Sequence, residues 1–214
     1  MEATSALKPQ RDLTTKIKGV IFDCGGVLAG NVPSRMLKTL AQRYPEEQRD
    51  TIQYWNNIKS MPEYKEADYW QDFKTMVKQV REPVEELQQM LQESYYCYTE
   101  CLELAKQVKA SGWLDQIATK FGFYDVFNKD LVIVSQTVRS AKPAKAIYEV
   151  TLAKLREELG EDLQASEVLF IDDKQENIAT ASELGMLGFC FNAHAQPSDV
   201  LKQALIDLHL LPKA

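Results

Sequence analysis

Four short apolar runs constrain the fold of this chain more than any other feature. They are GVIFD at 19–23, LVIVS at 131–135, VLFID at 168–172 and the weaker LGFCFN at 187–192. Continuous runs rich in Val, Ile and Phe are typical of strands buried on both faces, as in a parallel sheet. We therefore expect a strand at each of these four places.

Helical patterns separate the later runs. The spacing of apolar residues predicts helices over 143–159 and 174–184, ended by Gly160 and Gly185, and a last helix from Ser198. Strands that alternate with helices indicate an α/β fold, in which a parallel sheet carries helices on both faces through right-handed crossovers.

Residues 33–110 interrupt this alternation with one helical pattern after another. Ligands of open α/β sheets bind beyond the carboxyl ends of the strands, so a helical insertion directly after the first strand would cover that site as a lid. We therefore expect a flexible N-terminal segment, 1–17, a core made of 18–31 and 111–214, and a helical cap with its return helix, 32–110.

Composition narrows the class of protein. With 214 residues, 45% of them apolar, the chain is long enough to bury a core. A net charge of −6 without a long Lys/Arg cluster favours neither nucleic acid nor a membrane surface as a partner. No apolar run approaches the ~20 residues of a membrane span. The four cysteines lack a disulfide or zinc spacing, which indicates a reducing compartment, so we expect a cytoplasmic protein.

Three carboxylates follow predicted strands. Asp23 ends the first run, and Asp172 and Asp173 end the third, so all three fall at the same edge of a parallel sheet. Clustered carboxylates repel one another unless a cation lies among them. Oxygen-only ligation suits Mg²⁺, which retains water and binds well beside a phosphate.

Other residues at this edge suit phosphate. Lys142 would contact a phosphate oxygen and offset the charge of a nucleophilic carboxylate. Gly25 and Gly26 would let backbone N–H groups approach an anion, because no Cβ obstructs them. Together these residues predict phosphoryl transfer through Asp23.

Structural interpretations of the same residues stay open. Asp173 and Glu176 fit a capping box for the following helix, and Pro143 fits an ordinary helix start. Asp23 has no such helix-capping role, since two glycines rather than a helix follow it. The joint occurrence of these residues in this order favours chemistry.

The segments VIFDCGGVL, SAKPAKAIYEVTLAKL and VLFIDDKQENIATASELGM together resemble the haloacid dehalogenase-like (HAD) hydrolase superfamily. The resemblance covers about residues 18–195 and points to FDxGGV-type members with a helical, C1-type cap. It implies a Rossmann-like core, a Mg²⁺ cofactor and hydrolysis of a small phosphate monoester through an aspartyl-phosphate. Asn177 matches a DDxxxN extension, which we interpret as local structure.

The resemblance also implies roles for individual residues. Asp23 would be the nucleophile and a metal ligand, and Gly25 would offer its backbone carbonyl to the metal. Lys142 matches the third motif. Asp172 and Asp173 match the acidic fourth motif, with Asp173 as the direct ligand and Asp172 ordering metal-bound water.

Gly25 is a departure from the family pattern, because phosphatases of the superfamily typically carry a second aspartate there as general acid and base. Acid–base help accelerates reactions by ~10²–10⁴, so its absence predicts a slow enzyme or an easily displaced leaving group. The absence of this aspartate also makes dehalogenase activity an alternative hypothesis, which the complete acidic motif disfavours.

A second departure lies before Lys142. The family has a strand ending in a Ser or Thr that bonds the phosphate, whereas residues 105–128 show no apolar run that would form it. Its loss would leave backbone groups unpaired, at ~1–3 kcal/mol each. Ser135 would replace the missing hydroxyl if its own strand moved beside the first one; otherwise Ser135 only begins the loop to Lys142. The alternative function is therefore a catalytically impaired HAD-fold protein with a binding or regulatory role.

Overall fold

The structure is a computed structural model of the chain, and it describes residues 15–30, 33–47, 73–74, 80–108, 127, 129–133 and 135–213. Within these ranges the strands are β1, Gly19–Phe22, β2, Val168–Asp172, and β3, Leu187–Cys190. The α-helices are α1, Pro33–Arg43, α4, Val84–Ser94, α5, Thr99–Val108, α7, Ser135–Val138, α8, Lys145–Leu159, α9, Gln175–Glu183, and α10, Ser198–Asp207. Short 3₁₀ helices are η1, Pro45–Glu47, η3, Lys129–Leu131, and η4, Ala165–Glu167.

The described strands form a parallel sheet in the order β1-β2-β3. Phe22 of β1 lies opposite Ile171 of β2, and Asp172 lies opposite Cys190 of β3. The carboxyl ends of β1 and β2 are therefore level with each other. Three of the four predicted strands are confirmed.

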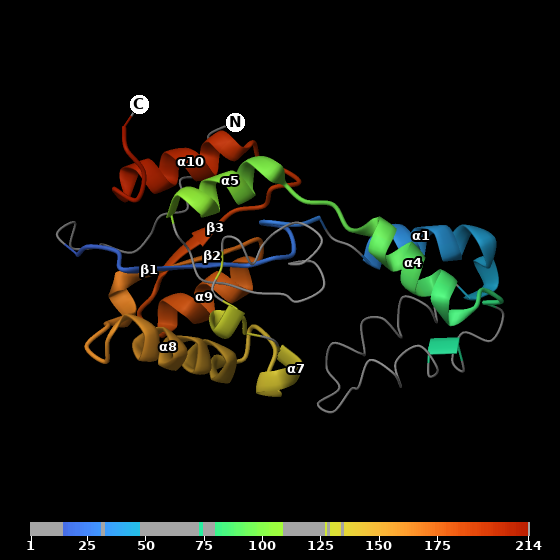
Figure 1. The fold of residues 1–214 in the computed structure, drawn as a ribbon, viewed down its shortest axis with the longest axis horizontal. Coiled ribbons are helices and arrows are strands. Elements are labelled where there is room, and N and C mark those ends of the chain that lie inside the picture. The colour runs from blue at the N-terminus through green and yellow to red at the C-terminus, as the bar shows by residue number, and fades with distance from the viewer. Residues whose placement is uncertain are drawn as a thin grey trace.

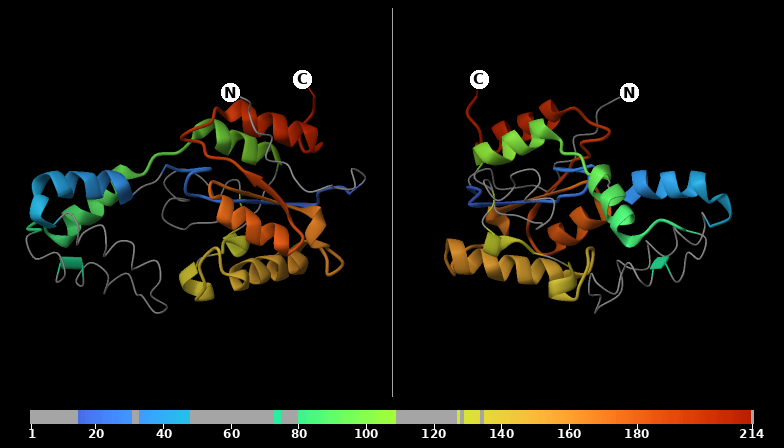
Figure 2. Two further views of the ribbon diagram at one scale, coloured as in Figure 1. Left: turned by 180° about the vertical axis from the view of Figure 1, so that it is seen from behind. Right: turned by 45° about the vertical axis from the view of Figure 1, so that its right-hand side comes forward.

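Helices cover both faces of this sheet (Figures 1 and 2). Successive strand residues point to opposite faces, so Leu169 and Ile171 pack with α5 and α10, whereas Val168 and Phe170 pack with α8 and α9. The predicted α/β fold with a parallel sheet and helices on both faces is confirmed. The predicted helices correspond to α8, α9 and α10.

The predicted strand over 131–135 is wrong. Leu131 ends the 3₁₀ helix η3, and Ser135 begins the short helix α7. Leu131 and Ile133 are partly buried against the apolar cluster under α8, so their apolar character serves packing. A run of four apolar residues does not distinguish a buried strand from a short irregular segment that packs on a helix, because it is too short to show a period.

Helices α1 and α4 form a unit with its own apolar cluster, which includes Met36, Leu40 and Leu87. Figure 1 shows the pair to one side of the sheet. Arg43 of α1 donates to Glu82 just before α4 at 2.7 Å, and Glu82 is buried. This unit corresponds to part of the helical insertion expected from the sequence.

The helical pattern over 83–110 is divided into two helices that belong to different parts of the molecule. Tyr95–Tyr98 separates α4 from α5, and α5 packs against α10 beside the sheet. Two backbone hydrogen bonds fasten this break to the chain leaving β1: Gly30 N–H donates to Tyr96 O and Tyr98 N–H donates to Leu28 O. The break is therefore the return connection from the α1–α4 unit to the core.

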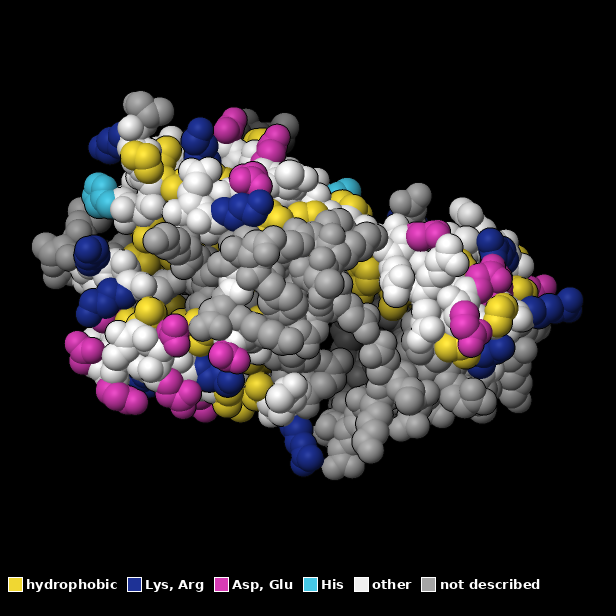
Figure 3. Space-filling view, viewed as in Figure 1, with side chains coloured by type: hydrophobic (Ala, Val, Ile, Leu, Met, Phe, Trp, Pro, Cys, Tyr) yellow, Lys and Arg dark blue, Asp and Glu magenta, His cyan; other side chains and the backbone are white. Residues whose placement is uncertain are grey.

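Three predicted features lie wholly or mostly outside the described residues. They are the flexible N-terminal segment 1–17, the helical pattern between 48 and 72, and the segment 105–128, where the family strand was expected to be missing. Among the described helices, none combines the length and the apolar character needed to cross a membrane. Charged side chains of both signs are interspersed over the described part of the face in Figure 3.

Candidate active site

Asp23 and Asp172 are neighbours at the carboxyl ends of β1 and β2. Asp23 directly follows Phe22, which is paired with Ile171, and its N–H donates to Ile171 O at 2.8 Å. Asp172 is the last residue of β2 and is completely buried. The pairing register therefore places two carboxylates side by side, although they are 149 positions apart (172 − 23) in the sequence.

Lys142 joins these two carboxylates. Its Nζ donates to Asp23 Oδ1 at 2.6 Å and to Asp172 Oδ2 at 2.5 Å. The side chains of Lys142 and Asp23 are 24% and 11% exposed, so solvent reaches the ion pair on one side. Lys142 lies three residues before α8. Because α8 packs against the sheet, the segment that leads into α8 places the Lys142 ammonium at this edge.

Asp173 reaches the same edge over the turn that follows β1. Gly26 in this turn has a φ of +89°, and a Cβ built on it would lie 2.4 Å from Asp173 Oδ2. The missing side chain of Gly26 thus makes room for Asp173. The Gly26 N–H, which we expected to approach an anion, donates to Ala29 O at 2.8 Å within the turn.

The three carboxylates form a group that suits a divalent cation. Asp23, Asp172 and Asp173 each offer an oxygen, and these oxygens lie within 4.8 Å of one another. With all groups ionised, three carboxylates and one ammonium leave a net charge of −2 (−3 + 1), which one Mg²⁺ would balance. Oxygen donors are the ligands that Mg²⁺ prefers. The donor set therefore fits the expected ion.

Burial and like charges alter the pKa values of these groups. Burial raises the pKa of Asp23 to about 6; Lys142 opposes this change, and Asp172 adds to it. Burial also raises the pKa of Asp173, together with the charge of Asp172. For Lys142, burial lowers the pKa, but Asp23 and Asp172 raise it by more. The site thus favours a bound cation, which would relieve the repulsion among its carboxylates.

Gly25 and Ser135 are placed less directly against this cluster. Gly25 forms an isolated bridge with Ala29, and a Cβ built on it meets no atom within 4 Å among the described residues. Ser135 begins α7 and does not end a strand, so the route by which we expected its hydroxyl to reach Asp23 is absent from the described sheet. A catalytic role for Ser135 stays a prediction.

A tyrosine pair that was not predicted from the sequence lies beside the site. Tyr96 and Tyr98 lie on the return connection, with their hydroxyl oxygens 3.3 Å apart. Burial, the Tyr96 hydrogen bond and the charge of Asp173 all contribute to a raised pKa of Tyr98, as expected of a hydroxyl that lies near the acidic cluster. The motif YYCY offers no spacing that would have distinguished these tyrosines from others in the helical insertion.

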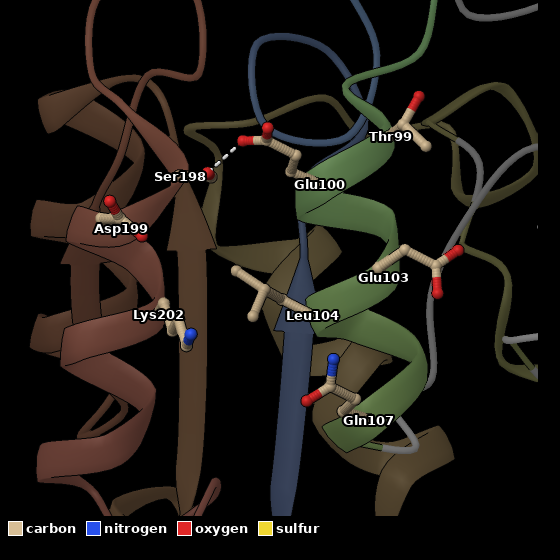
Figure 4. A pocket seen from close by; sticks show the side chains of 8 residues that line it. All are labelled: Thr99, Glu100, Glu103, Leu104, Gln107, Ser198, Asp199 and Lys202. Atoms are coloured by element: carbon tan, nitrogen blue, oxygen red, sulfur yellow. Dashed lines mark hydrogen bonds between the residues drawn. The ribbon is translucent and has the colours of Figure 1, made fainter. Parts of the chain in front are cut away.

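A separate pocket of about 340 Å³ lies between α5 and α10 (Figure 4). The Ser198 hydroxyl donates to Glu100 across it. None of the four charged residues of the candidate site lines this pocket, and its walls are the outer faces of two helices that cover the sheet. The candidate site at the strand ends is therefore separate from this pocket.

Solved structures share this architecture. A HAD family enzyme from Bacteroides thetaiotaomicron, in complex with magnesium and inorganic phosphate, is similar with a TM-score of 0.66 at 18% identity, over 86% of this chain and 98% of that one. The chain has the HAD fold. A HAD phosphatase from Thermococcus onnurineus has a TM-score of 0.54 at 17% identity, over 84% of this chain and 88% of that one.

The HAD fold is not confined to phosphatases. A dehalogenase is similar with a TM-score of 0.56 at 15% identity, over 85% of this chain and 87% of that one. No protein-family model matches the sequence, and no curated protein does. The family resemblance expected from the three motifs is thus supported at the level of the HAD fold.

We expect alanine to destabilise the protein at Gly26 but not at Gly25. Gly26→Ala forces an L-residue to a positive φ and pushes its Cβ against Asp173, so we expect a loss of at least about 1–2 kcal/mol in the free energy of unfolding. Gly25→Ala, the matched control, enters open space and should change stability by less than about 0.5 kcal/mol. Urea unfolding of both variants tests this, and equal losses would contradict it.

The raised pKa of Asp23 predicts a pH-dependent stability in Mg²⁺-free buffer. A carboxyl group whose pKa is higher in the folded protein contributes stability at low pH and loses it as the pH rises through the folded pKa. For Asp23 this window runs from 3.8 to about 6. Between pH 4 and pH 7, the free energy of unfolding of Asp23→Asn should therefore rise by about 2 kcal/mol relative to that of wild type.

The matched control for this pH series is Asp199→Asn, which removes an exposed carboxylate from α10. Its free energy of unfolding should stay within about 1 kcal/mol of wild type at every pH, because an exposed carboxylate in the first turn of α10 contributes little. A difference between Asp23→Asn and wild type that stays constant from pH 4 to pH 7 would mean that Asp23 has an ordinary pKa in the folded protein.

Proposed function

We propose that the protein is a Mg²⁺-dependent hydrolase of small phosphate monoesters, with Asp23 as the nucleophile. The observation that carries this proposal is the contact of Lys142 with both Asp23 and Asp172, at the sheet edge where Asp173 completes an acidic cluster. The fold of HAD enzymes, one of them solved with magnesium and inorganic phosphate, supports the same chemistry.

In the proposed reaction, Asp23 attacks the phosphorus atom. A bond forms between its carboxylate oxygen and phosphorus, and the ester P–O bond breaks, so the leaving oxygen departs with the electron pair and takes a proton from water. Water then cleaves the aspartyl-phosphate, which releases inorganic phosphate and restores the carboxylate. Lys142 neutralises Asp23 before the attack and offers N–H donors to phosphate oxygens.

The metal ion would contribute charge neutralisation of the phosphoryl group. The residues that would bind it are Asp23 and Asp173, with Gly25 through its carbonyl, and Asp172 would order bound water. The more accessible carboxylates are Asp23 and Asp173, because Asp172 is completely buried. The acidic cluster also favours a phosphatase over a dehalogenase, because displacement of a halide from carbon involves no phosphoryl group whose charge a divalent cation would offset.

Gly25 favours a second candidate, a HAD-fold protein with weak or no turnover that acts through binding. Gly25 provides no side chain to protonate the leaving oxygen, and the described residues leave open space there. A substrate whose leaving group departs without a proton escapes this limitation. An activated aryl phosphate is therefore the sharpest first substrate, and a 2-haloacid tests the dehalogenase reading in parallel.

The function is tested with Asp23→Asn. Wild type should release phosphate from an activated aryl phosphate only with Mg²⁺, and the variant should lose more than about 10³-fold in rate because the covalent step is removed. Asp199→Asn is the same chemical change on an exposed surface and should retain the wild-type rate. Equal rates for wild type and Asp23→Asn would instead support the binding protein.

Magnesium should also stabilise the folded chain, whether or not it turns over substrate. At 100 times its dissociation constant, Mg²⁺ should raise the free energy of unfolding by about 2.7 kcal/mol. Asp173→Asn removes a proposed ligand and should weaken this stabilisation, which thermal unfolding at several Mg²⁺ concentrations measures. An unchanged midpoint for wild type at millimolar Mg²⁺ would contradict a metal site here.

A further inference from the structure

The Asp172 carboxylate has both oxygens engaged by N–H donors. Its Oδ1 accepts the Lys174 backbone N–H at 2.9 Å and the Asn177 side-chain amide at 2.8 Å. Its Oδ2 accepts the Lys142 ammonium. Because Asp172 is completely buried, these donors replace all of its hydration. Its orientation is therefore set by protein groups alone.

Among the described residues, Asn177 supplies the side-chain donor to Oδ1. It lies in the first turn of α9 and is 3% exposed. Its Nδ2 faces Asp172, and its own Oδ1 is buried without a hydrogen-bond partner among the described residues. The reverse amide orientation would set an oxygen against the carboxylate, so Asp172 decides which end of Asn177 faces it. The contact with Asp172 is therefore the side-chain hydrogen bond that the structure gives Asn177.

A second contact fixes the backbone of Asn177. The hydroxyl of Tyr148 on α8 donates to Asn177 O at 3.1 Å, and both residues are buried. The ring of Tyr148 packs on Phe170 of β2, one of the residues beneath Lys142. The backbone of Asn177 is thus held by α8, whereas its side-chain amide contacts Asp172.

We propose that Asn177 is a positioning residue that holds Asp172 in the orientation that anchors Lys142 against Asp23. Rotation of the Asp172 carboxylate would carry Oδ2 away from Lys142 Nζ and leave the ammonium with Asp23 alone. Asp172 then serves Lys142, while Asp23 and Asp173 keep the more accessible oxygens for the cation. The sequence analysis had interpreted Asn177 as local structure.

The experiment compares Asn177→Leu, which keeps the size but has no donor, with Tyr148→Phe, which removes the neighbouring hydrogen bond and leaves the amide. The first readout is the acylation rate of Lys142 by acetic anhydride, measured by mass spectrometry without Mg²⁺. Asn177→Leu should raise this rate severalfold, because the ammonium loses a fixed partner. Tyr148→Phe should leave it within twofold of wild type.

The second readout is kinetic and rests on the proposed function. With saturating Mg²⁺ and an aryl phosphate, Asn177→Leu should lower kcat by about tenfold or more, as loss of a supporting residue does at such sites. KM and the Mg²⁺ dissociation constant from calorimetry should change by less than threefold. If Asn177→Leu does not fold, Asn177→Ala removes the same donor with a smaller side chain.

The outcomes separate the two proposals. A purely structural Asn177 would lower stability as Tyr148→Phe does, with Lys142 acylation and kcat unchanged, and this result would overturn the inference. A large loss of Mg²⁺ affinity in Asn177→Leu would also overturn the inference, since it would mean that Asp172 ligates the cation directly. If wild type lacks phosphatase activity, the acylation rates still decide the role of Asn177.

Discussion

The ammonium of Lys142, placed between Asp23 and Asp172, is the interaction on which the rest of the site depends. Two buried carboxylates side by side are strongly unfavourable, and removing one partner from a buried pair leaves an uncompensated charge. Lys142 is 119 residues from Asp23 and 30 from Asp172, so this one contact links the loop before α8 to the ends of β1 and β2. The sheet register and the packing of α8 together produce it.

The remaining negative charge explains the other features of this edge. Asp173 adds a third carboxylate, and the backbone of Gly26 leaves the space that it occupies. The ammonium neutralises one of the three charges; burial, together with the negative charge that is left, raises the pKa values of Asp23 and Asp173. A divalent cation and a phosphate ester are ligands that such a site can take together, because the cation offsets the charge of both the protein and the ester.

Sequence patterns predicted the strands β1, β2 and β3, the helices α8, α9 and α10, and the acidic residues at the strand ends. These succeeded because a buried parallel strand and an amphipathic helix each leave a period or a continuous apolar run that local residues alone display. The strand predicted from LVIVS was wrong because four apolar residues fit a strand and a packed irregular segment equally well. The roles of Gly26 and Asn177 were also missed, since each depends on a neighbour from a distant part of the chain.

The sequence by itself determined which residues are chemically competent: a carboxylate after each of two buried strands, a lysine before a helix, and glycines that permit a tight turn. Only the tertiary structure decided that Lys142 contacts both Asp23 and Asp172, that Gly26 makes room for Asp173, and that Asn177 orients Asp172. The physical reason is that propensity and hydrophobic period are local properties, whereas these contacts depend on strand register and on how α8 and α9 pack against the sheet.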